Sequence, residues 1–284
     1  MSLWSECELK WFRARSQNLR KYSFNIDLTA GGTFAAGVEL ARKRFYNDGL
    51  SEHDAVEEAI DFVIDTLHDQ EFQDSLKSPE RMGLLLKKYF EKWSLGHDEV
   101  TPLKLKSGNY AIEHKFTIEL PINHPELGVP LIFKGKLDML GEYMGRNWIV
   151  DEKTTKSMPK NQADLLAVSG QFVGYAWAAR ELGIETQGVL VRKCAIQTAG
   201  CKFEQYEVPI TDYMIDLWYE SFISKLGLMV DKYKAKMLDE DNFKKSFIPD
   251  FQSGCTSFFR PCAFREGCSS KHGEKFIKAE FKQL

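Results

Sequence analysis

The chain has 284 residues, of which 43% are hydrophobic and 28% are charged, as in an ordinary folded protein. The formal net charge of −3 argues against a protein that coats nucleic acid non-specifically, because such proteins need a positive surface. No apolar run reaches the ~18 residues of a membrane helix, and the first residues lack the basic and apolar blocks of a secretory signal. We therefore expect a cytoplasmic protein with no membrane partner, organised as a single elaborated domain over residues 1–284.

Residues 1–105 carry mostly helical patterns. A helix is predicted over 33–46, and the turn-forming residues 47–49 end it. Ser51, with Asp54 three residues later, resembles a capping box and begins a second helix with apolar residues at helical spacing. Ser78 followed by Pro79 begins a third helix. This part is therefore predicted to be a helical N-terminal addition.

The pattern changes to strands after residue 105. Strands are predicted over 110–120, 131–143 and 148–154, with a tight turn at 144–147 between the last two. A helix over 163–182 that ends at Gly183, a strand pair over 188–196 and 202–208, and a helix over 212–236 follow. This order predicts an α/β fold in which residues 106–240 form a core with a mixed central sheet flanked by helices. Residues 241–284 form a separate C-terminal segment that contains three cysteines.

Two carboxylates and a lysine are predicted to meet at the ends of adjacent strands. One strand runs through Asp138, and the next reaches Asp151 and Lys153 after a buried run. Because side chains alternate along a strand, Asp151 and Lys153 point to one face and Glu152 to the other. Two carboxylates can hold Mg²⁺, which lowers the pKa of its bound water, and a lysine can orient that water. The alternative is a solvated hairpin, because Asp-x-Lys alone is a weak signal.

A polar pair lies on the helix that follows. Gln171 and Tyr175 are four residues apart, so they share one helix face, whereas the residues between them are mostly apolar. Taken alone, the pair is typical of residues at the boundary of a core.

Together these residues resemble the RecB-like branch of the PD-(D/E)XK nuclease superfamily. The motifs that carry the resemblance are Gly135-x-x-Asp138, Asp151-Glu152-Lys153 and Gln171-x-x-x-Tyr175, in that order. The resemblance covers about residues 1–270 and implies a PD-(D/E)XK nuclease core. It also implies that Asp138 and Asp151 bind Mg²⁺ or Mn²⁺ together with the backbone carbonyl of Glu152. Lys153 would then activate water, and Gln171 and Tyr175 would support the site or the DNA.

The chain departs from this family at the first core helix. Many RecB-like nucleases have a metal-binding histidine there, but the corresponding stretch has Ala35 and Ala36 instead. Glu39 lies one helical turn further on, so it is either a further metal ligand or a surface carboxylate. The missing histidine leaves the number of bound metal ions open.

Three of the six cysteines lie within fourteen residues near the C-terminus, at Cys255, Cys262 and Cys268. Metal sites usually need four ligands, and Cys7 is a plausible fourth. This layout resembles the iron–sulfur nucleases of the RecB/AddB type and the CRISPR-associated adaptation nucleases, and it implies a 4Fe-4S cluster that pins the termini. The C-terminal phrase also resembles that of candidate exonucleases of bacteriophages.

Two other roles remain open for these cysteines, namely zinc binding and packing in the core without a ligand. Structural zinc sites use shorter C-x₂₋₄-C spacings, which disfavours zinc, and the cysteines can also be unligated core residues. Cys194 and Cys201 are predicted to be packing residues, although either could replace Cys7.

The predicted function is a metal-dependent DNA nuclease, an exonuclease or an end-processing enzyme of recombination, repair, replication or defence. Its partners would be linear DNA ends or single strands. The sequence has no G-x-x-x-x-G-K-[ST] motif, so a helicase or recombination partner would supply any unwinding. The alternatives are a non-catalytic DNA-end-binding or scaffold protein that kept the fold, and a zinc-stabilised adaptor with an accidental Asp-x-Lys.

Overall fold

The computed structural model describes residues 6–21, 26–68, 76–159, 162–238, 243–251, 255 and 261–283. They fall into two compact units. The sheet unit comprises residues 25–120 and 132–220, and the terminal unit comprises residues 1–24, 121–131 and 221–284. The single domain expected from the sequence stays a prediction. No helix in the described part of the chain is both long and apolar enough to cross a bilayer.

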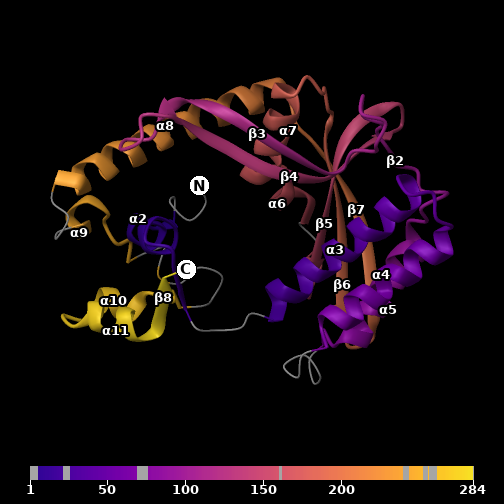
Figure 1. Ribbon diagram of the computed structural model, residues 1–284, viewed down its shortest axis with the longest axis horizontal. Helices are drawn as coiled ribbons and strands as arrows, with labels where there is room; N and C mark the ends of the chain where they lie inside the picture. Colours follow the sequence, from indigo (N-terminus) through magenta and orange to yellow (C-terminus); the bar gives the residue numbers. More distant parts are fainter. Residues whose placement is uncertain are drawn as a thin grey trace. The chain divides into compact units, whose positions relative to one another are not determined.

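A mixed sheet forms the centre of the sheet unit (Figure 1). Its strands are β2 (Thr101–Pro102), β3 (Ile112–Asn123), β4 (Pro130–Tyr143), β5 (Arg146–Thr155), β6 (Gly188–Gln197) and β7 (Gly200–Pro209). The order is β2-β4-β5-β6-β7, and β3 also pairs with β4. Strands β5 and β6 are parallel, whereas the pairs β4–β5 and β6–β7 are antiparallel. The predicted mixed sheet is therefore confirmed.

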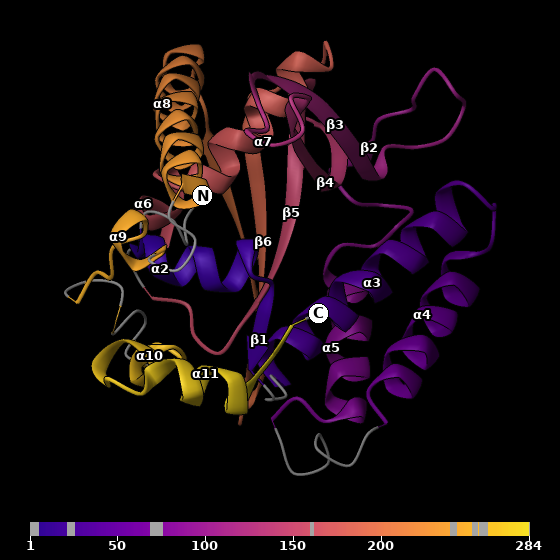
Figure 2. The ribbon, with the colours of Figure 1, turned by 60° about the vertical axis from the view of Figure 1, so that its left-hand side comes forward.

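Three helices cover one face of this sheet, as Figure 2 shows beside β5 and β6. They are α3 (Ile26–Tyr46), α4 (Glu52–Thr66) and α5 (Pro79–Lys92). Ser51 accepts a hydrogen bond from the Asp54 backbone N–H and Ser78 accepts one from that of Arg81, so both predicted N-caps are confirmed. The apolar faces of the three helices pack against the end of β6 and the start of β7 in one core cluster.

Helix α3 begins at Ile26, earlier than the predicted start at residue 33. The sequence favours a break at Gly31 and Gly32, since each glycine costs a helix about 1 kcal/mol relative to alanine. Packing against β5 explains the glycine at position 31. A Cβ atom added to Gly31 would lie 3.0 Å from Oγ1 of Thr154, so glycine permits the close approach of helix and strand.

The opposite face carries α6 (Gln162–Ala167), α7 (Gly170–Glu181) and the first part of α8 (Asp212–Leu238). The ring of Trp177 on α7 lies 5.9 Å from that of Trp218 on α8 and 5.3 Å from that of Phe133 on β4. The single helix predicted over 163–182 is wrong, because the chain is extended at Ser169 and two helices form. Strand β6 is buried along nearly its whole length, as expected for a strand covered on both faces.

The terminal unit contains the second part of α8, and its other elements are short. They are α2 (Glu8–Trp11), the π-helix η1 (Phe12–Ser16), β1 (Leu19–Lys21), α9 (Phe243–Ser246), α10 (Arg265–Ser269), α11 (Gly273–Glu280) and β8 (Phe281–Gln283). Strand β1 pairs antiparallel with β8, which joins the two ends of the chain. Phe12 stacks on Phe247 with ring centroids 4.3 Å apart. Sequence patterns did not predict this pairing, because three-residue strands carry almost no periodicity.

Candidate functional site

The predicted carboxylates and lysine lie together at one end of the β4–β5 pair. The antiparallel register pairs Met139 with Val150, so Asp138 and Asp151 are the next residues on adjacent strands. Asp138 Oδ2 accepts a hydrogen bond of 3.1 Å from the backbone N–H of Glu152. Lys153 Nζ donates to Asp151 Oδ1 at 2.7 Å. The fold thus brings together the three residues that the sequence indicated, Asp138 from β4 and Asp151 and Lys153 from β5.

Asp151 has an unsatisfied oxygen. Its side chain is 1% exposed, and its Oδ2 atom has no hydrogen-bond partner among the described residues. Burial raises the pKa of Asp151 to about 6, although Lys153 opposes the shift. Burial and the nearby Glu152 and Asp151 carboxylates raise the pKa of Asp138 to about 8. A buried oxygen without a donor is costly, so this pair of carboxylates favours a bound cation or proton.

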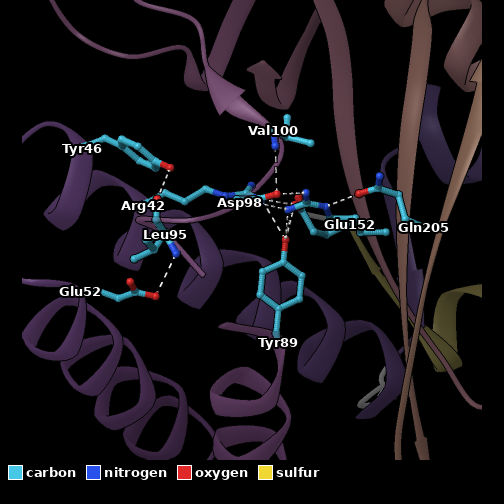
Figure 3. A network of polar contacts seen from close by, with 10 residues as sticks. Arg42, Tyr46, Glu52, Tyr89, Leu95, Asp98, Val100, Glu152 and Gln205 are labelled. Atoms are coloured by element: carbon cyan, nitrogen blue, oxygen red, sulfur yellow. Dashed lines mark hydrogen bonds and ion pairs between the residues drawn. The ribbon is translucent and has the colours of Figure 1, made fainter. Parts of the chain in front are cut away.

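Glu152 is also buried, but its environment is different (Figure 3). Its Oε1 atom accepts from Arg42 Nη2 at 2.6 Å and from the Tyr89 hydroxyl at 2.9 Å. Burial would raise the pKa of Glu152, but the Arg42 guanidinium holds it below its usual value. The alternation of side chains along a strand predicts that Glu152 lies on the opposite face of the sheet from Asp151 and Lys153. The sequence did not identify its partners, since Arg42 and Tyr89 lie on helices far away in the chain.

The same network continues along β6. Both terminal nitrogens of Arg192 donate to the carboxylate of Asp98 at 2.6 Å, and its Nε donates to Gln205 Oε1 at 2.9 Å. The guanidinium of Arg192 also lies 4.7 Å from the centre of the Trp93 ring. This network satisfies buried charges and connects α3, α5 and the sheet behind the candidate site.

Gln171 and Tyr175 lie on the first turns of α7. Gln171 Nε2 donates to the Tyr175 hydroxyl at 2.8 Å, as their shared helix face predicts. Burial raises the pKa of Tyr175, and the Asp151 and Asp138 carboxylates add to the increase. The Tyr175 hydroxyl and the Lys153 ammonium therefore interact electrostatically with the same two carboxylates.

A second group of charges lies next to the first. Glu39 on α3 accepts from Lys43 at 2.5 Å, and Lys136 Nζ lies 3.7 Å from its other oxygen. Lys136 also forms an ion pair with Glu113 on β3. Of these four residues, the sequence pointed only to Glu39. Glu113 and Lys136 belong to none of its motifs, although Lys136 precedes Asp138 by two residues on the same strand.

A sequence model of the PD-(D/E)XK nuclease superfamily matches residues 1–269. The chain belongs to the PD-(D/E)XK nuclease superfamily. Nucleases of this family act on the phosphodiester bonds of DNA, and they generally use divalent metals such as Mg²⁺ or Mn²⁺. No curated protein sequence matches the chain.

Two solved structures are similar at a low level. One is a protein of Eubacterium rectale named as a candidate exonuclease, with 12% identity, a TM-score of 0.40, and coverage of 84% of this chain and 74% of that one. The other is the protein SSO0001, with 12% identity, a TM-score of 0.29, and coverage of 66% of this chain and 74% of that one. At these TM-scores neither similarity bears on the activity of this PD-(D/E)XK chain.

The carboxylates of the candidate site fit a divalent cation. The unpartnered Asp151 Oδ2 and the adjacent Asp138 supply the oxygen ligands that Mg²⁺ prefers. Within the described ranges, no three or more His, Cys, Asp or Glu side chains are grouped to hold a metal ion. Mg²⁺ is often held by one or two carboxylates together with backbone or water oxygens, and Asp138 and Asp151 could supply these carboxylates.

The four cysteines predicted to bind a cluster all lie in the terminal unit. Cys7 Sγ accepts from the Asp250 N–H at 3.4 Å, and Cys255 Sγ donates to the Asp250 carbonyl at 3.4 Å. Burial raises the pKa of Cys268, and the thiols of Cys262, Cys7 and Cys255 are among its electrostatic neighbours. The structure does not show these thiols as a metal-binding group. Residues 252–254 and 256–260, within the predicted cysteine segment, lie outside the described residues.

The remaining two cysteines lie in the sheet unit. Cys194 is fully buried in the core cluster between the sheet and helices α3–α5, and Cys201 packs against that cluster. Their predicted role as packing residues is confirmed.

Proposed function

We propose that this PD-(D/E)XK protein is a metal-dependent DNA nuclease that acts as an exonuclease or processes DNA ends. The observation that carries the proposal is the buried, unpartnered Asp151 oxygen beside Asp138 and Lys153. A carboxylate in that state destabilises the metal-free protein unless a ligand compensates it. The family match over nearly the whole chain supplies the reaction class.

Each residue of the site has a proposed role. Asp138, Asp151 and the backbone carbonyl of Glu152 hold Mg²⁺ or Mn²⁺, which supplies a water of lowered pKa and polarises the phosphate. Lys153, held by Asp151, orients the attacking water or accepts its proton. Gln171 fixes the Tyr175 hydroxyl toward the same charges, so the pair positions Lys153 or the DNA.

End-labelled linear DNA and closed circular DNA test this proposal, each incubated with Mg²⁺, with Mn²⁺ and with EDTA. We expect metal-dependent loss of label from linear DNA, little cutting of the circle, and no cleavage with EDTA. Lys153→Met should lose turnover but retain most Mn²⁺ affinity. A protein that binds DNA ends without cleaving them under any metal condition would instead support the non-catalytic scaffold.

We also propose that Cys7, Cys255, Cys262 and Cys268 hold a 4Fe-4S cluster in the terminal unit. Two observations support it: Asp250 bridges Cys7 and Cys255 through its backbone, and the backbone N–H of Cys262 donates to the Cys255 carbonyl at 2.8 Å. Thiolates are the ligands that iron–sulfur clusters use.

Anaerobic purification followed by iron, sulfide and zinc analysis tests the cluster. We expect a brown protein that contains iron and acid-labile sulfide, and each of the four Cys→Ser variants should bleach it. Cys194→Ser is the matched control and should stay brown, because that residue packs in the other unit. Stoichiometric zinc without iron, or neither metal, would contradict this proposal and leave the carboxylate site untouched.

We propose that the enzyme works in the cytoplasm and that a helicase or recombination partner supplies unwound DNA ends. A pull-down of the DNA-bound complex that recovers an ATP-dependent unwinding activity would support such a partner.

A further inference from the structure

A cavity of about 320 Å³ lies wholly within the terminal unit. Its lining comes from α2 and η1, from the loop between β3 and β4, from β4, and from the second part of α8. No described residue of the proposed metal and cluster sites lines it. The volume is at the low end of the roughly 300–1,000 Å³ of small-molecule sites, so the cavity suits one small ligand or one flat group of a larger one.

Most of the cavity lining is apolar. Leu226, Met229 and Val230 on α8 contribute aliphatic side chains, and Met229 and Val230 are buried. Trp11 on α2 and Tyr233 on α8 add aromatic rings, and both residues are only half-buried. Aromatic side chains stack on the flat faces of nucleobases with little dependence on base identity. The apolar part of the lining is therefore suited to a flat heterocycle.

The polar lining residues offer donors and positive charge. Arg15 and Ser16, at the end of η1, are exposed, so the cavity reaches the surface. Arg15 forms no ion pair with any residue that the structure describes. His124 Nδ1 accepts from the backbone N–H groups of Glu126 and Leu127, each at 3.2 Å, so the proton of the neutral ring lies on Nε2. No aspartate or glutamate of the described chain lines the cavity, which therefore complements an anion rich in acceptors, such as a phosphate.

Two local features agree with a binding role. The element that ends in Arg15 and Ser16 is a π-helix, and such helices are rare and occur often at functional sites. On α8, the Lys236 ammonium lies 5.7 Å from the centre of the Tyr233 ring, which places a further positive charge beside the cavity. Aromatic rings next to basic groups are the combination that proteins use for single-stranded nucleic acid.

We infer that this cavity binds one unpaired nucleotide of a DNA strand, with the base against Trp11 and Tyr233 and a phosphate at Arg15. The inference rests on the proposed function, because the strand is the DNA on which the nuclease would act. It gives the terminal unit a role in holding DNA that is independent of the cysteines. A free nucleotide released by cleavage has the same chemistry, so the test separates the two sources.

Binding of single strands in EDTA tests the inference without cleavage. The full-length protein is titrated into a labelled oligothymidylate and into an abasic oligomer of the same length, and fluorescence anisotropy gives both affinities. Wild type should prefer the oligothymidylate by about tenfold, the order expected for stacking of one base. Tyr233→Leu keeps an apolar side chain against the core cluster but removes the ring, so it should lose most of this preference. Tyr213→Leu, at an exposed tyrosine in the sheet unit, is the control and should keep it.

The phosphate contact has its own variant. Arg15→Gln should weaken the binding of both oligomers alike, and it should reduce the slope of log affinity against log salt by about 0.7, the value for one phosphate of a single strand. Arg20→Gln, at an exposed arginine on β1, is the matched control and should leave the base preference and the slope unchanged. Thymidine 5′-monophosphate is added as a competitor, and it should compete less well than an unlabelled oligomer at equal nucleotide concentration. Equal competition would overturn the assignment to a strand and make the released nucleotide the ligand.

The outcomes separate this inference from the proposed function. Equal affinity of wild type for the two oligomers, or an unchanged preference in folded Tyr233→Leu, would overturn the cavity's role even if the protein cleaves DNA. If Tyr233→Leu does not fold, the exposed Arg15 decides, since wild-type affinity and salt slope in Arg15→Gln would also overturn it. A preference that is lost in Tyr233→Leu and kept in Tyr213→Leu supports the cavity even if no metal restores cleavage, in which case only the proposed hydrolysis fails.

Discussion

Asp151 and Glu152 are neighbours on β5, and each is less than a tenth exposed, yet burial has opposite consequences for them. On one face of the sheet, burial raises the pKa of Asp151 to about 6, and one of its oxygens has no hydrogen-bond donor among the described residues. On the other face, Arg42 and Tyr89 satisfy Glu152, and its pKa lies below the usual value. A compensated buried carboxylate stabilises the fold, whereas an uncompensated one favours a ligand.

The largest effect should come from replacing the uncompensated carboxylate. Asp151→Asn should reduce metal-dependent cleavage on the order of 10³-fold, because it removes a proposed metal ligand. In the metal-free protein near pH 8 it should leave the free energy of unfolding unchanged or raise it by about 1–2 kcal/mol, since a buried negative charge is lost. Cleavage rates and urea denaturation measure the two effects, and a folded variant with wild-type activity would disprove the site.

Replacing the compensated carboxylate should mainly affect stability. Glu152→Ala leaves the buried Arg42 guanidinium without its carboxylate, so the free energy of unfolding should fall by about 3–5 kcal/mol. Urea denaturation with EDTA present measures this loss. The double variant Arg42→Met with Glu152→Met is the matched control and should recover much of it, because no unpaired charge remains. If Glu152→Ala were as stable as wild type, the contrast between the two faces would be wrong.

The free energy of unfolding of the metal-free protein should depend on pH through the uncompensated carboxylates, of which Asp138 has the largest pKa shift. Asp138 has a pKa of about 8 in the folded protein against an ordinary value of 3.8, so between these values the folded state binds more protons than the unfolded state. Its contribution to stability is therefore present at low pH and is lost as the pH rises from about 4 to 8. The difference in unfolding free energy between wild type and Asp138→Asn should change by about 2 kcal/mol or more across this window. Saturating Mg²⁺ should remove the dependence, and an equal difference at pH 5 and pH 8.5 would contradict it.

The smallest effect should come from the hydroxyl on α7. Tyr175→Phe removes the hydrogen bond from Gln171 but leaves the ring, so turnover should fall by about tenfold at most, with little change in Mn²⁺ affinity. Tyr213→Phe, at an exposed tyrosine on α8, is the control and should have no effect. A loss as large as that of Asp151→Asn would mean that the tyrosine contacts the reacting groups directly.

Local patterns in the sequence determined much of the fold. Capping residues set the starts of α4 and α5, and alternation along β4 and β5 put Asp138, Asp151 and Lys153 together and turned Glu152 away. These features depend on neighbours within a few residues, or across one hairpin, and such interactions leave a period in the sequence. The mixed sheet followed from the order of the elements.

Packing between distant segments decided the rest. The glycines of α3 predict a helix break, and only the contact between Gly31 and Thr154 explains why a glycine lies inside the helix. The strands β1 and β8 form only because the two ends of the chain pair with each other. The partners of the buried charges were equally hidden, since Arg42 lies 110 residues from Glu152 in the sequence. An ion pair between remote residues leaves no period, so only the tertiary structure could show that Glu152 is neutralised, that Lys136 occupies the neighbourhood of Glu39 and Glu113, and that Asp151 is left with an open oxygen.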